Sequence, residues 1–519
     1  MVIAQVKTGT LCGIDGLPVT VEVDLASGIP GLTIVGLPDT AVSEARERLR
    51  AAIKNAGLEF PLKKVVINLA PADMRKVGSG FDLPMAVGIL LASGVLEATA
   101  WLESACFVGE VSLAGELRRV HGALSLVIMA KTLGYQSVVV PEDNVAEASL
   151  VDGIDVYGLS HLQELPVLLL HPASFLKPVN RSAWEAAQTP TPTNDFKDVK
   201  GQAVAKRALE IAAAGGHNLI MIGPPGSGKS MLAKALPGIL PPLAFDEMLE
   251  VSRIYSVAGL LSPKQCLVME RPFRSPHHSA SIAGITGGGT VPKPGEISLA
   301  HRGVLFLDEL VEFPRPVLEV LRQPLEDGTI TISRARQHTT FPAKCMVLAA
   351  MNPCPCGYRG DTSRQCVDSE HQIQRYVSKL SGPLLDRIDL HIEVPRLSET
   401  ELLKAPDSTE DSATVRTRVI AARQRQLDRL AGEDGVFCNA ELSAAHLKTH
   451  AVLDDAAQQV MAQAIRRLNL SARSFDRILR LARTIADLAG ETLLSANHLA
   501  EALQYRAMDR LYQLSSAGV

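Results

Sequence analysis

The sequence feature that most constrains the fold is an apolar run that breaks into glycines and then restarts as a helix. The run is "LIMI" at residues 219–222, the turn has the pattern Gly-x-x-x-x-Gly-Lys-Ser over Gly223–Ser230, and "SMLAKAL" follows as the helix. Glycines let backbone N–H groups turn inward on phosphates, and the start of a helix adds partial positive charge. This succession of strand, loop and helix predicts an α/β core that binds a nucleotide.

Within this loop, two side chains have distinct expected roles. We expect Lys229 to reach the β- and γ-phosphates of the nucleotide, and Ser230 to bind a Mg²⁺ ion. The predicted nucleotide-binding residues of the loop are Gly223, Pro224, Pro225, Gly226, Ser227, Gly228, Lys229 and Ser230.

Two further apolar strands end in polar side chains that suit the same chemistry. The first, "GVLFLDEL" at 303–310, ends in two acids. A nucleotide-bound Mg²⁺ takes a carboxylate ligand, which suits Asp308, and a second acid can polarise the attacking water, which suits Glu309. The other strand, "CMVLAAMNP" at 345–353, ends in Asn352, which we expect to orient that water.

The chain is too long for a single hydrophobic core, because it has 519 residues. Strand-like stretches such as 63–70 and 137–141 alternate with helix-like ones such as 41–57, which predicts an N-terminal domain at 1–170. A stretch rich in Pro, Thr, Ser and Asn predicts a linker at 171–194. The nucleotide-binding core then covers 195–396. Apolar residues at three- and four-residue spacing predict a helical domain at 397–519, with helices in 412–432, 454–470, 474–490 and 495–508.

Charge and hydropathy exclude several classes of protein. The formal net charge is -4, which argues against a generally basic nucleic-acid coat protein but allows a local basic surface. The N-terminus lacks the layout of a signal peptide, and the longest uncharged apolar stretch, Leu83–Leu96, is too short to span a bilayer. We therefore expect a cytoplasmic protein without a membrane partner, whose eight cysteines are reduced.

With these motifs in this order, the chain resembles the AAA+ ATPases, the ring-forming class of phosphate-loop proteins. The segment "GPLLDRIDL" at 382–390 resembles their arginine-finger segment, which implies that Arg387 completes the site of a neighbouring subunit. The segment "SARSFDRILRLAR" resembles the start of the lid helix that carries the sensor 2 arginine, which implies Arg473, with Arg477 as the alternative. An arginine that acts on a neighbour requires a ring, so the resemblance implies a homo-oligomer, a hexamer. Local ion pairs remain the alternative interpretation of both arginines.

A longer segment is more specific than these nucleotide motifs. Residues 271–310, "RPFRSPHHSASIAGITGGGTVPKPGEISLAHRGVLFLDEL", resemble the magnesium-chelatase-like ComM/YifB family, and the similarity extends from 16–53 to the "ARTIADL" helix at 482–488. The resemblance implies a Lon-protease-like (ribosomal S5 domain 2-like) α+β domain, an AAA+ P-loop α/β core and a C-terminal helical lid. It also implies ATP and Mg²⁺ as cofactors, and branch migration of single-stranded or branched DNA in homologous recombination during natural transformation.

Two segments are candidate DNA contacts of such a motor. The β-alternation in 329–350 is interrupted by a turn around 336–338, which predicts a hairpin projecting from the core. The glycine-rich run 284–296 is poorly suited to helix or strand and is a second candidate pore loop. Solvated loop tips are the competing interpretation of both. The candidate phosphate contacts are Arg334, Arg336, Lys344 and Lys293.

A cysteine cluster follows Asn352 in "PCPCGYRGDTSRQCVDSEH" at 353–371. Closely spaced thiols in a cytosolic loop suggest a structural zinc ion, which takes four soft or borderline ligands, although unliganded reduced thiols explain them equally well. Such an ion would staple the loop beside the Asn352 strand. The candidate zinc ligands are Cys354, Cys356, Cys366 and His371, with Asp368 as the alternative fourth ligand.

The N-terminal domain raises the alternative of an ATP-dependent protease, because 67–90 and 109–144 resemble strand and helix landmarks of the Lon proteolytic domain. In that comparison the catalytic serine falls at Gly80 and the lysine at Leu124. Neither residue can supply the required chemistry, so we expect a scaffold without a dyad. The remaining arrangement is a shifted nucleophile, Ser79, with Lys76 or Lys131 as its base.

As a scaffold, this domain could grip DNA through a basic face. A second alternative function is an ATPase subunit that powers metal insertion into a porphyrin, as in magnesium chelatase, and the fused Lon-like domain argues against it. The lysines and arginine of the candidate basic face are Lys54, Lys63, Lys64, Arg75 and Lys76.

Overall fold

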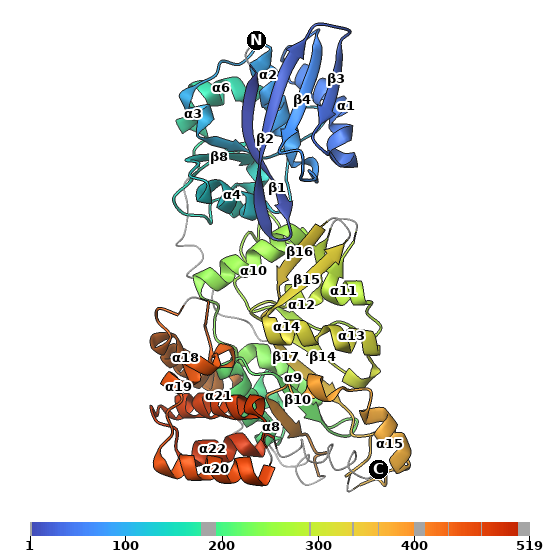
Figure 1. Cartoon of the computed structure of the whole chain (residues 1–519), viewed down its shortest axis with the longest axis vertical. Helices are drawn as coiled ribbons and strands as arrows, with labels where there is room; N and C mark the ends of the chain where they lie inside the picture. The colour runs from blue at the N-terminus through green and yellow to red at the C-terminus, as the bar shows by residue number, and fades with distance from the viewer. Residues whose placement is uncertain are drawn as a thin grey trace.

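The computed structural model describes residues 3–177, 194–289, 292–334, 337–361, 363–398, 410–433, 435–468 and 470–506, without the side chains of residues 334 and 337. The described parts form an N-terminal α+β domain, a nucleotide-binding core and a helical domain, with the first two stacked along the long axis (Figure 1). Most of the predicted linker, 178–193, lies outside the described residues, as does Arg336. None of the helices in the described part of the chain has the length and hydropathy needed to span a bilayer.

The N-terminal domain is built on one seven-stranded mixed sheet, ordered β3-β4-β2-β1-β5-β8-β9. Its strands are β1 (Ala4–Cys12), β2 (Asp15–Ala26), β3 (Gly31–Val35), β4 (Lys64–Ala70), β5 (Ala105–Phe107), β8 (Ser137–Pro141) and β9 (Asp155–Leu159), with a small β6 (Glu110–Val111) and β7 (Leu117–Arg118) ribbon. Its α-helices are α1 (Thr40–Asn55), α2 (Asp82–Ala92), α3 (Ala100–Glu103), α4 (Ala123–Thr132), α5 (Val145–Ala148) and α6 (Leu165–Leu170).

The hydropathy of two elements explains how this domain packs. In β2, the buried Val19, Val21 and Val23 alternate with more exposed residues, as expected for a strand with one covered face. Helix α2 is apolar on nearly all sides and packs on β1 and β2. Gly88 permits this close approach, because a Cβ at this position would lie 2.6 Å from Cγ2 of Val23.

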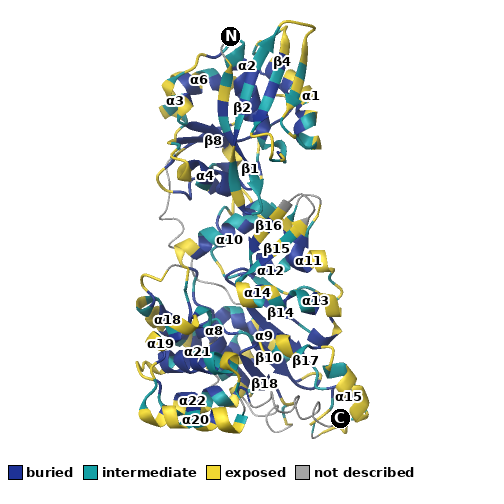
Figure 2. Cartoon of the chain, viewed as in Figure 1, coloured by how far each residue is buried: buried dark blue, intermediate teal, exposed yellow. Residues whose placement is uncertain are grey.

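The nucleotide-binding core has a five-stranded parallel sheet ordered β11-β14-β17-β10-β18. Its central strands are apolar and buried on both faces, as Figure 2 shows, which is typical of parallel sheets. The strands are β10 (Leu219–Ile222), β11 (Phe273–Arg274), β14 (Val304–Leu307), β17 (Met346–Met351) and β18 (Leu390–Glu393). The helices are α8 (Ala203–Gly215), α9 (Lys229–Ala235), α10 (Phe245–Ala258), α11 (Ile282–Thr286), α12 (Glu296–Leu299), α13 (Arg315–Val320), α14 (Arg322–Asp327), α15 (Glu370–Val377) and α16 (Gly382–Leu385).

Two antiparallel ribbons project from this core. The predicted hairpin is present as β15 (Thr329–Arg334) and β16 (Gln337–Pro342), and the pairing of Arg334 with Gln337 places its connection at 335–336. The glycine-rich run was expected to form neither helix nor strand. That expectation was wrong, because the run contributes to α11 and to a short ribbon of β12 (Gly287–Gly288) and β13 (Lys293–Pro294).

The helical domain contains the four predicted helices as α18 (Ser412–Arg429), α20 (Asp455–Leu468), α21 (Ala472–Ala489) and α22 (Ala496–Gln504), together with a short α19 (Ala444–His450). Helices α18 and α21 pack on α8, so the helical domain and the nucleotide core share one apolar cluster. A second link is the side-chain amide of Gln426, which donates to the carbonyl of Ala214 in α8 at 3.1 Å.

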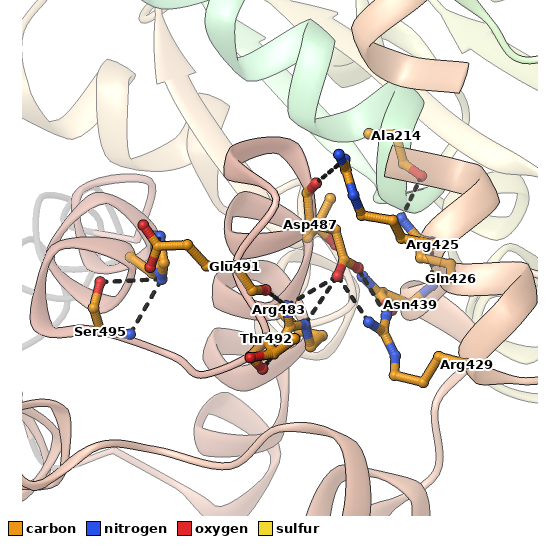
Figure 3. Close-up of polar contacts among 12 residues, drawn as sticks. Ala214, Arg425, Gln426, Arg429, Asn439, Arg483, Asp487, Glu491, Thr492 and Ser495 are labelled. Atoms are coloured by element: carbon orange, nitrogen blue, oxygen red, sulfur yellow. Dashed lines mark hydrogen bonds and ion pairs between the residues drawn. The ribbon is translucent and has the colours of Figure 1, made fainter. Parts of the chain in front are cut away.

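A buried carboxylate organises this bundle (Figure 3). Asp487 is 1% exposed. Its carboxylate accepts hydrogen bonds from Nη1 and Nη2 of Arg429 at 2.7 Å, from the side-chain amide of Asn439 at 2.8 Å and from Nε of Arg483 at 3.1 Å. Because a buried charge is costly unless it is paired, these contacts fix α21 against α18. Asp487 lies near the end of α21, and Arg473 lies at its start.

The N-terminal domain joins the nucleotide core through α10, which packs on α4. The turn between β1 and β2 reaches into the core, where Ile14 packs against Ile254, Leu299 and Phe341. Beside this apolar contact, Nη2 of Arg253 donates to Asp15 at 2.6 Å. The turn therefore contacts both α10 and the hairpin β15–β16.

Candidate active site

The phosphate loop leaves β10 at a position that admits only glycine. A Cβ at Gly223 would lie 2.1 Å from the carbonyl oxygen of Val394, the residue that follows β18. Further along the loop, Gly226 and Gly228 have φ values of 76° and 94°, in the left-handed region that glycine adopts without strain. The loop therefore turns tightly between β10 and α9, as the sequence predicted.

Lys229 folds back over this loop. Its Nζ donates to the carbonyl of Gly223 at 2.6 Å, to that of Pro224 at 2.9 Å and to Oδ1 of Asn352 at 3.3 Å. Burial lowers the pKa of Lys229 to about 8, and the negative charge of Asp308 partly opposes this shift. The ammonium group is therefore held at the opening of the loop. When a nucleotide binds there, its phosphate oxygens would replace the backbone carbonyls as hydrogen-bond partners of the ammonium group.

The two predicted magnesium ligands touch each other. Oγ of Ser230 donates to Oδ2 of Asp308 at 2.8 Å, although the two residues are far apart in sequence. Mg²⁺ prefers such hard oxygen ligands and keeps several waters, so a hydroxyl and one carboxylate beside a phosphate site fit the ion. The described residues thus agree with a Mg²⁺–nucleotide site at Ser230 and Asp308.

Glu309 lies next to this pair but is turned towards a histidine. Its backbone is left-handed, with φ 51°, and its side chain is 59% exposed. Oε2 of Glu309 lies 3.1 Å from Nδ1 of His278, whose ring contacts that of His277 with centroids 4.1 Å apart and ring planes tilted by 34°. Sequence reasoning left both histidines unassigned. The available signal was their position just after β11, the strand beside β14 in the same parallel sheet.

One geometric fact brings these residues together. In a parallel sheet all carboxyl ends lie at one edge, here called the carboxyl edge, and all amino ends lie at the other, the amino edge. The phosphate loop, the acid pair, Asn352 and the histidine pair follow β10, β14, β17 and β11 respectively, so all of them lie at the carboxyl edge. This is the position in which ligands bind to open α/β sheets.

The two predicted arginines lie elsewhere, at the amino edge. Arg387 precedes β18, whose Leu390 pairs with Leu219 at the start of β10. The four residues of β10, about 13 Å of strand, therefore separate Arg387 from the phosphate loop of its own chain. Arg387 forms an ion pair with Glu326, and Arg473 binds the other oxygen of Glu326 at 3.1 Å. Glu326 thus holds both arginines at one place.

The environments of these arginines differ. The side chain of Arg387 is 11% exposed, and burial together with the positive charge of Arg473 lowers its pKa. The side chain of Arg473 is 68% exposed. The alternative residue, Arg477, is 13% exposed and lies 3.8 Å from Asp389, within the protein. Arg473 is therefore better placed than Arg477 to meet a neighbouring molecule, whereas Arg387 is no more exposed than Arg477.

The structure corrects the predicted zinc ligands. It brings Cys354, Cys356 and Cys366 together with Asp368, and these four donor atoms lie within 4.8 Å of one another. His371 was expected as the fourth ligand, but it lies on the exposed first turn of α15 and is not in the group. Helix α15 begins after Ser369, whose side chain caps it, and this cap turns the chain away from the cluster.

The candidate DNA contacts differ in their surroundings and in how far the structure describes them. Lys293 is exposed at the start of β13, whereas Arg336 lies outside the described residues and the side chain of Arg334 is not described. Lys344 was expected to add positive charge to the hairpin. Instead it lies at the hairpin base, where its Nζ donates to the carbonyl of Gly435 at 3.0 Å and approaches Glu441 at 3.8 Å. This lysine joins the core to the helical domain.

At the Lon-like positions, the described contacts of Ser79 and Lys76 do not join the two as a catalytic pair. Ser79 donates its hydroxyl to Glu110, not to a lysine. Lys76 is fully buried and donates to backbone carbonyls, among them that of Met74 at 2.8 Å, so it is neither the proposed base nor part of a basic face. Gly80 faces Val108 and Val120, and Leu124 is fully buried. The role of this domain as a scaffold stays a prediction.

Comparisons with known proteins agree with the motifs. Residues 195–402 match the family model described as magnesium chelatase, subunit ChlI. Residues 21–144 match the model for subunit ChlI of Mg-chelatase, and residues 409–506 match the model for the C-terminal part of that subunit.

Similar proteins include two of nearly the same length. The chain is 45% identical to the uncharacterized protein YifB of Salmonella typhimurium, over 98% of each chain. It is also 45% identical to the competence protein ComM of Haemophilus influenzae, over 99% of each chain. A shorter similarity, 28% identity over 38% of this chain and 24% of the relative, links it to an uncharacterized MCM-type protein of Methanocaldococcus jannaschii.

Proposed function

The chain belongs to the magnesium-chelatase-like ComM/YifB family of AAA+ proteins, and from this premise we propose that it is an ATP-driven ring motor that moves DNA. The observation that carries the proposal is the placement of Arg387 and the phosphate loop at opposite edges of one parallel sheet. A chain with this arrangement has an incomplete hydrolytic site by itself. A ring of identical subunits, a hexamer, completes every site by placing one subunit's amino edge against the next subunit's carboxyl edge.

The chemistry assigned to each residue follows from its position. Ser230 and Asp308 would hold Mg²⁺, which neutralises charge on the β- and γ-phosphates. Lys229 binds the same phosphates, Asn352 orients the attacking water, and Glu309 polarises it once its carboxylate leaves His278. Arg387 and Arg473 of the neighbouring subunit stabilise the charge that develops on the transferred phosphoryl group. Glu326 supplies their counter-charge before the subunits meet.

DNA is the proposed substrate because of the relatives and of two loops. One relative is named a competence protein, and another is named for the MCM type. Lys293 is exposed at the start of β13, and Arg334 is the last residue of β15, so these two candidate contacts lie on the two antiparallel ribbons of the core. Backbone phosphate contacts of this kind do not depend on sequence, as translocation requires. We infer branch migration of single-stranded or branched DNA, in the cytoplasm, during recombination of transforming DNA.

The family descriptions favour one other candidate, an ATPase subunit for insertion of a metal into a porphyrin. The two candidates differ in what stimulates ATP hydrolysis. The purified protein is assayed for ATPase activity with single-stranded DNA, with a four-way junction, with protoporphyrin and with casein. The proposal expects stimulation by DNA and ATP-dependent conversion of the junction. Indifference to every form of DNA overturns it, and cleavage of casein would revive the protease alternative.

A further inference from the structure

The loop that follows Asn352, here called the cysteine loop, brings a compact cluster of donor atoms close to the phosphate loop. The Sγ atom of Cys354 lies 3.4 Å from that of Cys356 and 3.6 Å from that of Cys366, and the last two are 3.5 Å apart. Oδ2 of Asp368 lies 3.7 Å from Sγ of Cys366 and accepts the backbone N–H of Cys356 at 2.8 Å. Four donors therefore converge on one point.

This geometry fits a tetrahedral zinc ion. Zinc–sulfur bonds of about 2.3 Å at tetrahedral angles place sulfur atoms about 3.8 Å apart, slightly more than the observed separations. Three thiolates and one carboxylate make up the four ligands that a closed structural site requires. A zinc ion at the centre would bind the three sulfur atoms as thiolates and offset their mutual repulsion.

The same loop contacts the nucleotide site. Cys354 follows Asn352 by two residues and is fully buried. At Gly357, a Cβ would lie 2.6 Å from Cδ of Pro225, which belongs to the phosphate loop, and 3.7 Å from Cγ of Asn352. The N–H of Gly357 donates to the carbonyl of Cys354 at 3.0 Å. One tight turn therefore connects the cysteine cluster to Pro225 and Asn352.

We propose that Cys354, Cys356, Cys366 and Asp368 bind one zinc ion, and that this ion holds the phosphate loop in the shape that binds nucleotide. The second half of the proposal rests on the proposed function. The short segment that carries the ligands contains no helix or strand in its described residues, so the ion replaces an apolar core as its cross-link. Without the ion, the turn at Gly357 loses its support and Pro225 loses the surface against which it packs.

The fourth ligand determines how readily the ion exchanges. Zinc is a borderline-soft ion and thiolates hold it well, whereas a carboxylate is a harder ligand. A site with Asp368 in place of a fourth cysteine therefore releases zinc more readily than a site of four thiolates. Nucleotide affinity then follows the availability of zinc, which makes the cluster a regulatory site as well as a structural one.

The first test measures metal without any reference to activity. The full chain is loaded with zinc, its metal content is determined, and Co²⁺ is substituted to observe thiolate-to-cobalt absorption. Cys366→Ser and Asp368→Ala should lose the ion, while His371→Ala and Cys266→Ser, both outside the cluster, should retain one ion per chain. Asp368→Cys should slow release of the ion to a chelator. If the unmodified protein binds neither zinc nor Co²⁺, or if His371→Ala alone loses the ion, the metal site is overturned.

The second test measures the coupling. The affinity of a non-hydrolysable ATP analogue is compared for zinc-loaded and chelated protein, with circular dichroism to show that the fold persists. Removal of zinc should weaken binding by about tenfold or more. Gly357→Ala should weaken binding similarly while it retains the ion, because its Cβ would collide with Pro225. Gly360→Ala is the matched control, since Gly360 has a similar φ of 80° and open space around its Cβ.

The outcomes separate the two proposals. Equal nucleotide affinity with and without zinc, together with an unaffected Gly357→Ala variant, overturns the coupling and leaves the ATPase proposal standing. Zinc-loaded protein that binds no nucleotide overturns the proposed function, and the coupling with it, but not the metal site.

Discussion

The single most informative residue is Lys229, whose buried ammonium has a pKa lowered to about 8. Below pH 8 the group is charged and can bind phosphate, and above it the charge is lost. We therefore expect the affinity for ATP to fall as the pH rises from about 8 to 10, by up to tenfold per pH unit. Binding isotherms across this range provide the measurement, and Lys229→Arg, which stays charged, serves as the control. An affinity that is flat with pH in the unmodified protein contradicts this assignment.

The lowered pKa of Lys229 also affects the stability of the fold. As the pH rises, this effect runs opposite to the effect on ATP affinity. In the unfolded chain its pKa is close to 10.5, so between pH 8 and 10.5 the unfolded state holds more protons than the folded state. The contribution of Lys229 to the free energy of unfolding therefore rises with pH in this window, while affinity for the nucleotide falls. Denaturant unfolding of the unmodified protein and of Lys229→Met, compared at both ends of the window, measures this contribution.

Glu309 permits a second prediction at this scale. Glu309→Gln keeps the shape of the side chain but removes its ability to accept a proton. It should bind ATP with unchanged affinity and hydrolyse it about 10²- to 10⁴-fold more slowly, the usual contribution of a general base. Single-turnover hydrolysis measures this effect. Glu312→Gln is the matched control. Glu312 is three residues away and exposed, and its ion pair with Lys379 is long at 3.9 Å. Equal rates for the two variants would remove Glu309 from the mechanism.

At the scale of elements, the joint between α5 and α10 depends on one buried carboxylate. Glu147 is 1% exposed and accepts hydrogen bonds from Arg119 and the backbone of Leu124, both at 3.1 Å, from Asn144 at 3.3 Å, and from Ser256 of α10. Several donors, one of them charged, therefore depend on it.

Glu147→Ala leaves these donors without an acceptor and should lower the free energy of unfolding by about 3–5 kcal/mol. Glu142→Ala, which removes an exposed ion pair with Lys177, should cost less than about 1 kcal/mol. Urea unfolding gives both values, and limited proteolysis shows whether the N-terminal domain separates from the core first. Similar losses in the two variants would show that the buried network does not hold the joint.

Elements with strong local signals were predicted well. The strands β10, β14 and β17 and the helices α18, α20, α21 and α22 all lie where hydropathy placed them. The glycine-rich run was misjudged because two short strands within it, Gly287–Gly288 and Lys293–Pro294, pair with each other despite the low strand preference of glycine and proline. Lys344 was misjudged because the acceptor at Gly435 lies in another domain.

At the scale of the whole molecule, the opposite edges of the core sheet imply that catalysis needs two subunits. Arg387→Ala should bind ATP normally and assemble, but hydrolyse at least about 10³-fold more slowly, as expected for loss of an arginine that acts on a neighbour's nucleotide. Lys229→Ala should fail to bind ATP. Mixed in varying ratios, the two inactive variants should recover part of the activity, since some interfaces then pair an intact loop with an intact Arg387. Absence of recovery at every ratio would contradict action across the interface.

The sequence by itself determined the chemistry of the nucleotide site, because its signals are local. A glycine turn followed by Lys229 and Ser230, and strands that end in Asp308 and Asn352, predict phosphate and Mg²⁺ binding from local patterns. Tertiary structure alone decided which distant groups meet. Glu309 contacts His278, and Asp368 rather than His371 lies with the three cysteines. Arg387 and Arg473 both bind Glu326, at the edge of the sheet away from their own phosphate loop. The physical reason is that strand order and helix packing follow from burying both faces of the sheet, which no local pattern records.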